Sequence, residues 1–343
     1  MPLLEVKNLH ILFRTRKGTV RAVNDVSFAL NAGKTLGIVG ESGSGKSVSA
    51  MSILRLLDDN GDIESGEILF TENGETLDLV KLPPEKMYAI RGNRISVIFQ
   101  EPMTALNPVF SVGRQLAEPF RIHRKLSKKQ AFAEAEKMLR AVRIPNPERV
   151  IKQYPHQLSG GMRQRVMIAM ALACEPKILI ADEPTTALDV TIQAQILRLM
   201  RDLQKERGTA ILFITHDLGV IREMADDVAV LYCGQVVQLC KAEEVFDDGG
   251  YSHPYTEGLL ISAPTAERAG MRLEPISGSV PHPSKLPKGC KFAPRCKYRT
   301  EKCIAEEPSL FDTQTGGRIR CFYPEKEERR SADHAKLIVD YPS

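Results

Sequence analysis

The sequence contains no tryptophan, few aromatic residues (6%) and no apolar run that approaches the length of a membrane-spanning helix. Its clearest apolar stretch, residues 166–174, is far shorter than the ~20 residues that a helix needs to cross a bilayer. A block of basic residues with interleaved aromatic residues is also missing, and 47 Lys and Arg are nearly balanced by 43 Asp and Glu. We therefore expect no transmembrane segment and no nucleic-acid binding.

Cysteine is present in an odd number, seven, which argues against a secreted disulfide scaffold. Cys174, Cys233 and Cys240 lie in apolar segments, where a reduced cysteine packs as a small hydrophobic residue. Residues 1–7 lack the charged and then apolar arrangement of a signal peptide. These observations predict a cytoplasmic protein.

The length of 343 residues exceeds the size at which one hydrophobic core normally stops growing, so we expect a main domain and an appendage. The boundary is predicted near residue 250, because residues 251–343 are richer in proline and cysteine. Short apolar runs over residues 4–30 predict an N-terminal β subdomain. Between residues 100 and 158, proline breaks and amphipathic patterns predict a helical insertion, in which a capping box starts one helix at Ser127.

Three apolar runs predict buried strands, at residues 35–39, 178–181 and 210–215. A helix is expected after the first strand, over residues 46–57. Another is expected between the second and third strands, over residues 190–207, where Gly208 closes it. This alternation of buried strands and helices predicts an α/β fold with a parallel sheet that is covered on both faces.

A phosphate-binding loop is predicted after the first buried strand. Residues 40–47 match the full G-x-x-x-x-G-K-S pattern, in which backbone N–H groups converge on phosphate oxygens. Lys46 would add positive charge and Ser47 a hydroxyl for magnesium. The alternative is a chance glycine-rich turn. The predicted nucleotide-binding residues of this loop are Gly40, Ser42, Gly43, Ser44, Gly45, Lys46 and Ser47.

Polar side chains follow the other buried strands. Asp182 ends one strand, where its carboxylate can hold magnesium, and Glu183 can orient or deprotonate the attacking water. The alternative is a solvated turn before Pro184. Gln100 follows the run at residues 95–99 and can contact magnesium or the lytic water, whereas His216 follows residues 210–215 and can contact the γ-phosphate. A lone histidine there would more often be structural, and one glutamine by itself carries almost no weight.

A second glycine-rich segment, Ser159, Gly160 and Gly161, opens an apolar helix, and the N–H groups at such a helix start can bind phosphate. Because the chain already has one phosphate loop, this segment is predicted to bind the γ-phosphate of a nucleotide held by another subunit.

Residues 4–250 thereby resemble the ATP-binding cassette (ABC) family, the ATPase subunits of ABC transporters. The resemblance implies a RecA-like phosphate-loop core with an antiparallel β subdomain and an inserted helical subdomain at about residues 101–165. It also implies two composite ATP sites at a dimer interface, with Asp189 of Ala187-Leu188-Asp189 near the seam. Glu183 would be the catalytic carboxylate, and an aromatic residue of the β subdomain, for which Phe13 is the candidate, would stack on adenine.

Three segments look more narrowly like ATPase subunits of dipeptide and oligopeptide importers of the DppD type. They are residues 100–108, 154–158 and 253–256. The resemblance implies a sibling ATPase or a second copy, two membrane permeases and, indirectly, an extracytoplasmic binding protein, at the cytoplasmic face of the cell membrane. The resemblance does not decide whether the transported solute is a dipeptide, a longer peptide, a nickel chelate or another small molecule. A cassette ATPase acting on nucleic acid would normally carry two cassettes or a basic arm, and a purely regulatory module would lack Glu183 or His216.

The appendage contains a set of four cysteines with the spacing C-x5-C-x6-C-x17-C: Cys290, Cys296, Cys303 and Cys321. Four thiolates suit a 4Fe-4S cluster as well as zinc, and unligated thiols are the third alternative. The resemblance to DppD-type subunits, some of which are similar to iron-sulfur proteins in this region, favours the cluster. We expect a structural role for it, since no second redox motif appears.

Overall fold

The computed structural model of the protein describes residues 1–16, 18–101, 105–186, 188–247, 250–263 and 275–342. Residues 102–104 of the segment at 100–108, and Ala187, lie outside the described residues. The chain divides into two compact units. One comprises Met1–Ala29, Leu36–Val80 and Thr215–Ser343, and the other comprises Leu30–Thr35 and Lys81–Ile214.

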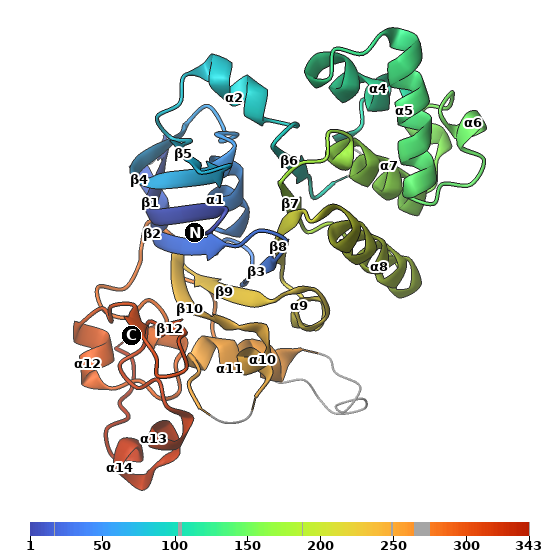
Figure 1. Ribbon diagram of the computed structural model, residues 1–343. Coiled ribbons are helices and arrows are strands. Elements are labelled where there is room, and N and C mark those ends of the chain that lie inside the picture. The colour runs from blue at the N-terminus through green and yellow to red at the C-terminus, as the bar shows by residue number, and fades with distance from the viewer. Residues whose placement is uncertain (17, 102–104, 187, 248–249, 264–274, 343) are drawn as a thin grey trace. The chain divides into compact units, whose positions relative to one another are not determined.

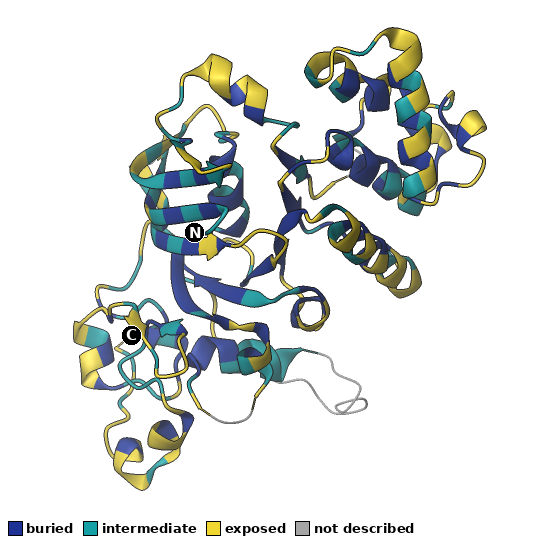
Figure 2. Cartoon of the chain, viewed as in Figure 1, coloured by how far each residue is buried: buried dark blue, intermediate teal, exposed yellow. Residues whose placement is uncertain are grey.

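The first unit contains the predicted N-terminal β subdomain. Its four-stranded sheet has the order β2-β1-β4-β5, formed by β1 (Leu4–Thr15), β2 (Gly18–Leu30), β4 (Gly61–Glu72) and β5 (Glu75–Asp78). Strands β1 and β4 pair antiparallel and bury one face, as the alternating colours of Figure 2 show. This alternation has the period of two that a half-buried strand requires.

A second set of strands in this unit leads to the phosphate loop. Strand β3 (Thr35–Val39) is buried at every residue and pairs in parallel with β9 (Asp227–Tyr232). Strand β9 pairs antiparallel with β10 (Gln235–Lys241), which continues to the short strands β12 (Arg318–Ile319) and β11 (Phe311–Asp312). The C-terminal region thus extends the sheet that carries β3. The helices of this unit are α1 (Lys46–Ile53), α9 (Leu218–Met224), α10 (Ala242–Phe246), α11 (Pro254–Ser262), α12 (Glu301–Ala305), α13 (Lys326–Arg330) and α14 (Ala332–Ala335), with the 3-10 turn η3 (Ala293–Arg295).

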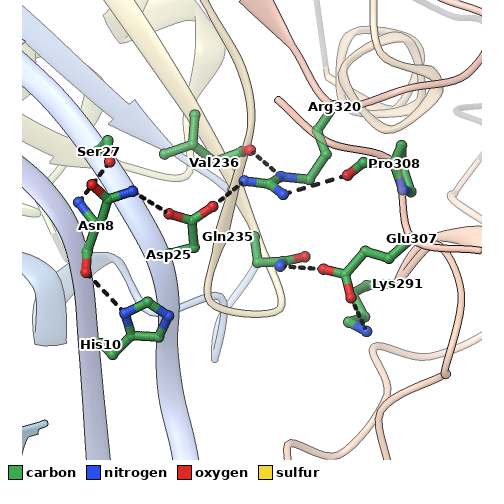
Figure 3. Close-up of polar contacts among 10 residues, drawn as sticks. All are labelled: Asn8, His10, Asp25, Ser27, Gln235, Val236, Lys291, Glu307, Pro308 and Arg320. Carbon is green, nitrogen blue, oxygen red and sulfur yellow. Dashed lines mark hydrogen bonds and ion pairs between the residues drawn. The ribbon is translucent and has the colours of Figure 1, made fainter. Parts of the chain in front are cut away.

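Polar contacts fasten the C-terminal region to β2 and β10 (Figure 3). Arg320 donates to Asp25 Oδ2 at 2.9 Å and to the carbonyl oxygen of Val236 at 3.1 Å, and Asn8 donates to Asp25 Oδ1 at 3.0 Å. Burial raises the pKa of Asp25, but the hydrogen bonds from Asn8 and Arg320 outweigh it, so the pKa lies below its usual value.

The second unit contains three parallel strands and the predicted helical insertion (Figure 1). Strands β6 (Ile95–Ile98), β7 (Ile178–Asp182) and β8 (Ala210–Thr215) pair in that order. Helix α8 (Val190–Arg207) begins at Asp189 and ends at Gly208, whose φ of 65° closes it as predicted. The remaining helices are α2 (Pro84–Ile90), α4 (Val112–His123), α5 (Lys128–Ala141), α6 (Pro147–Val150) and α7 (Gly160–Leu172), with the turn η1 (Pro155–Gln157).

The capping box predicted at Ser127 is present, because the Ser127 and Gln130 side chains each accept from the other residue's backbone N–H. The helix predicted over residues 46–57 is shorter, since α1 ends at Ile53. Arg55 adopts a φ of 52°, a left-handed conformation that cannot continue a right-handed helix. Among the described helices, none combines the length and the apolar character that a membrane crossing requires.

Candidate nucleotide-binding site

The loop between β3 and α1 has a backbone that glycine alone fits at two positions. Gly40 has a φ of 152°, and a Cβ atom there would lie 2.2 Å from the carbonyl oxygen of Leu231. Gly45 has a φ of 96°, and a Cβ atom there would lie 2.8 Å from the carbonyl oxygen of Ala22. The loop therefore folds tightly against β2 and β9, and it leads directly into the start of α1.

Lys46 is the first residue of α1 and points back over the loop. Its side chain is buried, and Nζ donates to the carbonyl oxygens of Gly40 at 2.7 Å and Glu41 at 2.9 Å. Ser42 and Gly43 are exposed, whereas Ser44 is buried. A lysine ammonium group and the N-terminus of a helix at one end of an exposed glycine loop form a site that attracts phosphate. The structure thus brings the predicted loop residues together.

The second unit holds the predicted carboxylates. Asp182 is the last residue of β7 and is 5% exposed. Glu183 follows with a φ of 44°, and its N–H donates to the carbonyl oxygen of Ile214 at 2.9 Å. A left-handed conformation in a residue other than glycine costs on the order of 1 kcal/mol, and such strain is concentrated at functional sites.

The carboxylate of Glu183 is held by two donors. Gln100 Nε2 donates to Glu183 Oε2 at 3.1 Å, and Thr186 Oγ1 donates to the same oxygen at 2.9 Å. Strands β6 and β7 pair in register up to Ile98 and Ala181, so the residues that follow them meet at one sheet edge. The structure thus places Gln100 next to Glu183. Thr186 was missed, although its spacing of three residues from Glu183 within a turn was a usable signal.

The second glycine-rich segment begins helix α7. Ser159 is its N-cap and accepts from the N–H of Met162 at 3.3 Å, and both Ser159 and Gly160 are exposed. A Cβ atom on Gly161 would lie 3.0 Å from Ile192 Cγ2, and Ile192 donates its N–H to Asp189 Oδ1 at 2.9 Å. The starts of α7 and α8 are therefore neighbours. Asp189 therefore has a structural role as the N-cap of α8, in addition to its predicted place near the dimer seam.

The two other predicted nucleotide contacts are His216 and Phe13. His216 is exposed and directly follows β8. Phe13 is half-buried and lies in β1 opposite Gly61, where a Cβ atom would come within 2.6 Å of the Phe13 ring. Neither observation tests the predicted contact of His216 with γ-phosphate or of Phe13 with adenine, and both stay predictions.

All four cysteines of the appendage line one small cavity of about 20 Å3, with Phe292, Tyr298 and Tyr323 among its other walls. Burial raises the pKa of Cys290 to about 11 and that of Cys296 to about 12, and it also raises the pKa of Cys321. A space of this size holds about one water molecule. Among the described residues, no group of three or more His, Cys, Asp or Glu side chains is arranged to hold a metal ion, so the structure does not support the predicted 4Fe-4S or zinc centre.

The loop, the strand-end carboxylates and the α/β architecture define a phosphate-loop nucleotide-binding protein. Residues 23–186 match the family model described as "ABC transporter", and residues 239–303 match "Oligopeptide/dipeptide transporter, C-terminal region". The chain is 50% identical to the oligopeptide transport ATP-binding protein AppD of Bacillus subtilis, over 95% of this chain and 98% of that protein. It is 51% identical to the oligopeptide transport ATP-binding protein OppD of Haemophilus influenzae, over 91% and 94% of the two chains. The chain belongs to the family of ABC transporter ATP-binding proteins.

Solved structures agree on the fold. The dimeric ATP-binding cassette MJ0796 bound to ADP and Pi matches with a TM-score of 0.62 and 28% identity, over 70% of this chain and 98% of that one. The cassette fold predicted from the sequence is thereby confirmed.

Proposed function

We propose that the protein is the ATP-hydrolysing subunit of a membrane ABC transporter that imports peptides of the dipeptide and oligopeptide class. The observation that carries this proposal is the 50% identity to AppD, which extends through the C-terminal region as well as the cassette. The match of residues 239–303 to the C-terminal region of oligopeptide and dipeptide transporters supports the same substrate class.

In the ATPase reaction, the loop from Gly40 to Ser47 would cradle the phosphates, and Lys46 would neutralise part of their charge. Ser47, Asp182 and Gln100 offer the hydroxyl, carboxylate and amide oxygens that Mg2+ prefers, and the ion would supply charge neutralisation on the phosphates. Glu183 would orient and deprotonate the attacking water. Gln100 and Thr186 support this role, because their hydrogen bonds to Oε2 fix the rotation of the Glu183 carboxylate.

Hydrolysis would be coupled to assembly of two cassettes. The exposed start of α7, at Ser159, Gly160 and Gly161, would bind the γ-phosphate of ATP held by a second ATPase subunit, either a sibling chain or another copy. Asp189 accepts a hydrogen bond from Ile192, whose side chain lies beside Gly161 at the start of α7. Asp189 would therefore border the same interface. The dimeric state of the related cassette MJ0796 supports this arrangement.

The remaining partners would be two permease subunits and, indirectly, an extracytoplasmic binding protein. The protein would lie at the cytoplasmic face of the cell membrane, bound to the permeases through the region at residues 108–124 and the loop at Gln100. The absence of a basic block supports a role without nucleic acid.

We further propose that the four cysteines ligate a 4Fe-4S cluster, with zinc as the alternative. The proposal rests on the donor set, four cysteines that line one cavity. Anaerobic purification followed by iron, sulfide and zinc analysis tests this. Iron and sulfide at about four each per chain are expected, and Cys296→Ser should lower them. Colourless protein without iron would refute the cluster.

ATP-dependent dimerisation tests the ATPase proposal. With ATP and Mg2+, Glu183→Gln should form a stable dimer with its cassette partner, by size-exclusion chromatography with light scattering, and should hydrolyse ATP at least about a hundredfold more slowly. Lys46→Ala is the matched control, because it should lose ATP binding and dimerisation together. Sustained turnover by Glu183→Gln would refute the assigned role.

A further inference from the structure

Glu41, the second residue of the phosphate loop, is held by the C-terminal region on two sides. Its N–H donates to Tyr255 Oη at 2.7 Å. Its carboxylate accepts from Arg295 Nη1 at 2.6 Å and from Arg295 Nη2 at 3.0 Å. This two-pronged contact is the strongest geometry that an arginine and a carboxylate can form. It joins a residue of the cassette to one that lies 254 positions further along the chain.

Arg295 is itself fixed in place. Its side chain is 3% exposed, and Nε donates to the carbonyl oxygen of Ser277 at 3.0 Å. The guanidinium group lies 5.8 Å from the centre of the Tyr232 ring and 5.9 Å from that of Phe292. Tyr232, Phe292 and Tyr255 pack on one another with ring centres 4.6 to 5.5 Å apart. A rigid aromatic cluster therefore holds the positive charge against the loop.

The position of Glu41 gives this contact a consequence for nucleotide binding. The carbonyl oxygen of Glu41 accepts from Lys46 Nζ at 2.9 Å, so the residue that the C-terminal region holds also contacts the phosphate-binding lysine. A carboxylate within a loop that binds polyanionic phosphate opposes binding unless an opposite charge neutralises it.

We propose that Arg295 is a positioning residue for ATP binding, which acts by neutralising the Glu41 carboxylate beside the phosphate site, whereas Tyr255 contacts the loop backbone. The C-terminal region is then part of the nucleotide site as well as an appendage. This inference rests on the proposed function, in that it takes residues 40–47 as the triphosphate site.

Charge substitution separates this role from a simple tether between the C-terminal region and the loop. Arg295→Met keeps a long side chain but leaves Glu41 without its partner, so the affinity for ATP should fall about tenfold. Glu41→Gln removes the negative charge and should bind ATP as tightly as the wild type or tighter. The double variant Glu41→Gln/Arg295→Met should regain most of the affinity that Arg295→Met loses. A tether predicts the opposite pattern, in which Glu41→Gln weakens binding as much as Arg295→Met and the double variant shows no rescue.

The experiment measures Kd for a fluorescent ATP analogue with Mg2+ on the full chain, after thermal unfolding has shown that each variant is folded. If Arg295→Met does not fold, Glu41→Gln alone decides, because weaker ATP binding by that variant would overturn the proposal.

The wild type and Lys46→Ala show whether the proposed function stands. Failure of the wild type to bind ATP refutes that function. If the wild type binds and Lys46→Ala does not, an Arg295→Met variant with wild-type affinity refutes only the role of Arg295.

Discussion

Replacing Thr186 by valine removes the hydroxyl that donates to Glu183 Oε2 at 2.9 Å and leaves the shape of the side chain nearly unchanged. A hydrogen bond to a charged group contributes ~1.5–3 kcal/mol. Thr186 is exposed, and Gln100 still donates to the same oxygen, so the lower end of this range applies. Since ~1.4 kcal/mol corresponds to a factor of ten in rate, kcat for ATP hydrolysis should fall about tenfold. KM for ATP should stay within about twofold, because the lost contact orients the carboxylate and does not bind nucleotide.

The assay is steady-state ATP hydrolysis by the assembled transporter, with Thr186→Ser as the matched control. Serine keeps the donor hydroxyl, so Thr186→Ser should retain at least half of the wild-type kcat. A Thr186→Val variant as active as the wild type would refute the reasoning. So would a Thr186→Ser variant as impaired as Thr186→Val, because the methyl group would then matter and the hydrogen bond would not.

Gly40→Ala should lower the affinity for ATP by about a hundredfold or more, measured by calorimetry, because its Cβ would lie 2.2 Å from the carbonyl oxygen of Leu231 and the loop would have to move. An affinity within threefold of the wild type would contradict this. Asp25→Asn, which keeps the left-handed φ of 62° accessible, should lower the free energy of unfolding at pH 7 by ~1 kcal/mol, since Arg320 loses its charged partner. The pKa of Asp25 is lower in the folded state than in the unfolded state, so this stabilisation is present above the unfolded pKa of ~3.9 and is lost as the pH falls through the folded value. The free energies of unfolding of the wild type and Asp25→Asn, measured with urea, should therefore converge at low pH. A difference between them that stays constant with pH would show that Asp25 acts through something other than its charge.

Local signals in the sequence predicted much of the fold. Helix α8 ends at Gly208 as predicted, because a C-cap is a property of a few neighbouring residues. The buried strands β3, β7 and β8 were predicted from apolar runs, which are likewise local features of the sequence. The contact between Gln100 and Glu183 was not predicted, although residues that follow neighbouring parallel strands meet at one sheet edge.

Contacts between distant segments could not be predicted from the sequence. The pairing of Arg295 with Glu41 joins two short polar segments that carry no periodic pattern, so nothing local indicates it. The early end of α1 depends on the left-handed conformation of Arg55, and arginine has no intrinsic preference for that conformation. The cysteine spacing predicted a metal centre. The four cysteines line one cavity, but no described group of side chains is arranged to hold a metal ion, because spacing alone does not fix the ligand geometry.

The most direct test of the central claim is mass spectrometry of the complexes that tagged Glu183→Gln retains when it is solubilised anaerobically from its native membranes with ATP and Mg2+. We expect two permease subunits and a second cassette ATPase, together with their loss when Lys46→Ala replaces Glu183→Gln as the bait. Recovery of only ribosomal or other soluble proteins would contradict the assignment to a peptide transporter and would leave the ATPase chemistry intact.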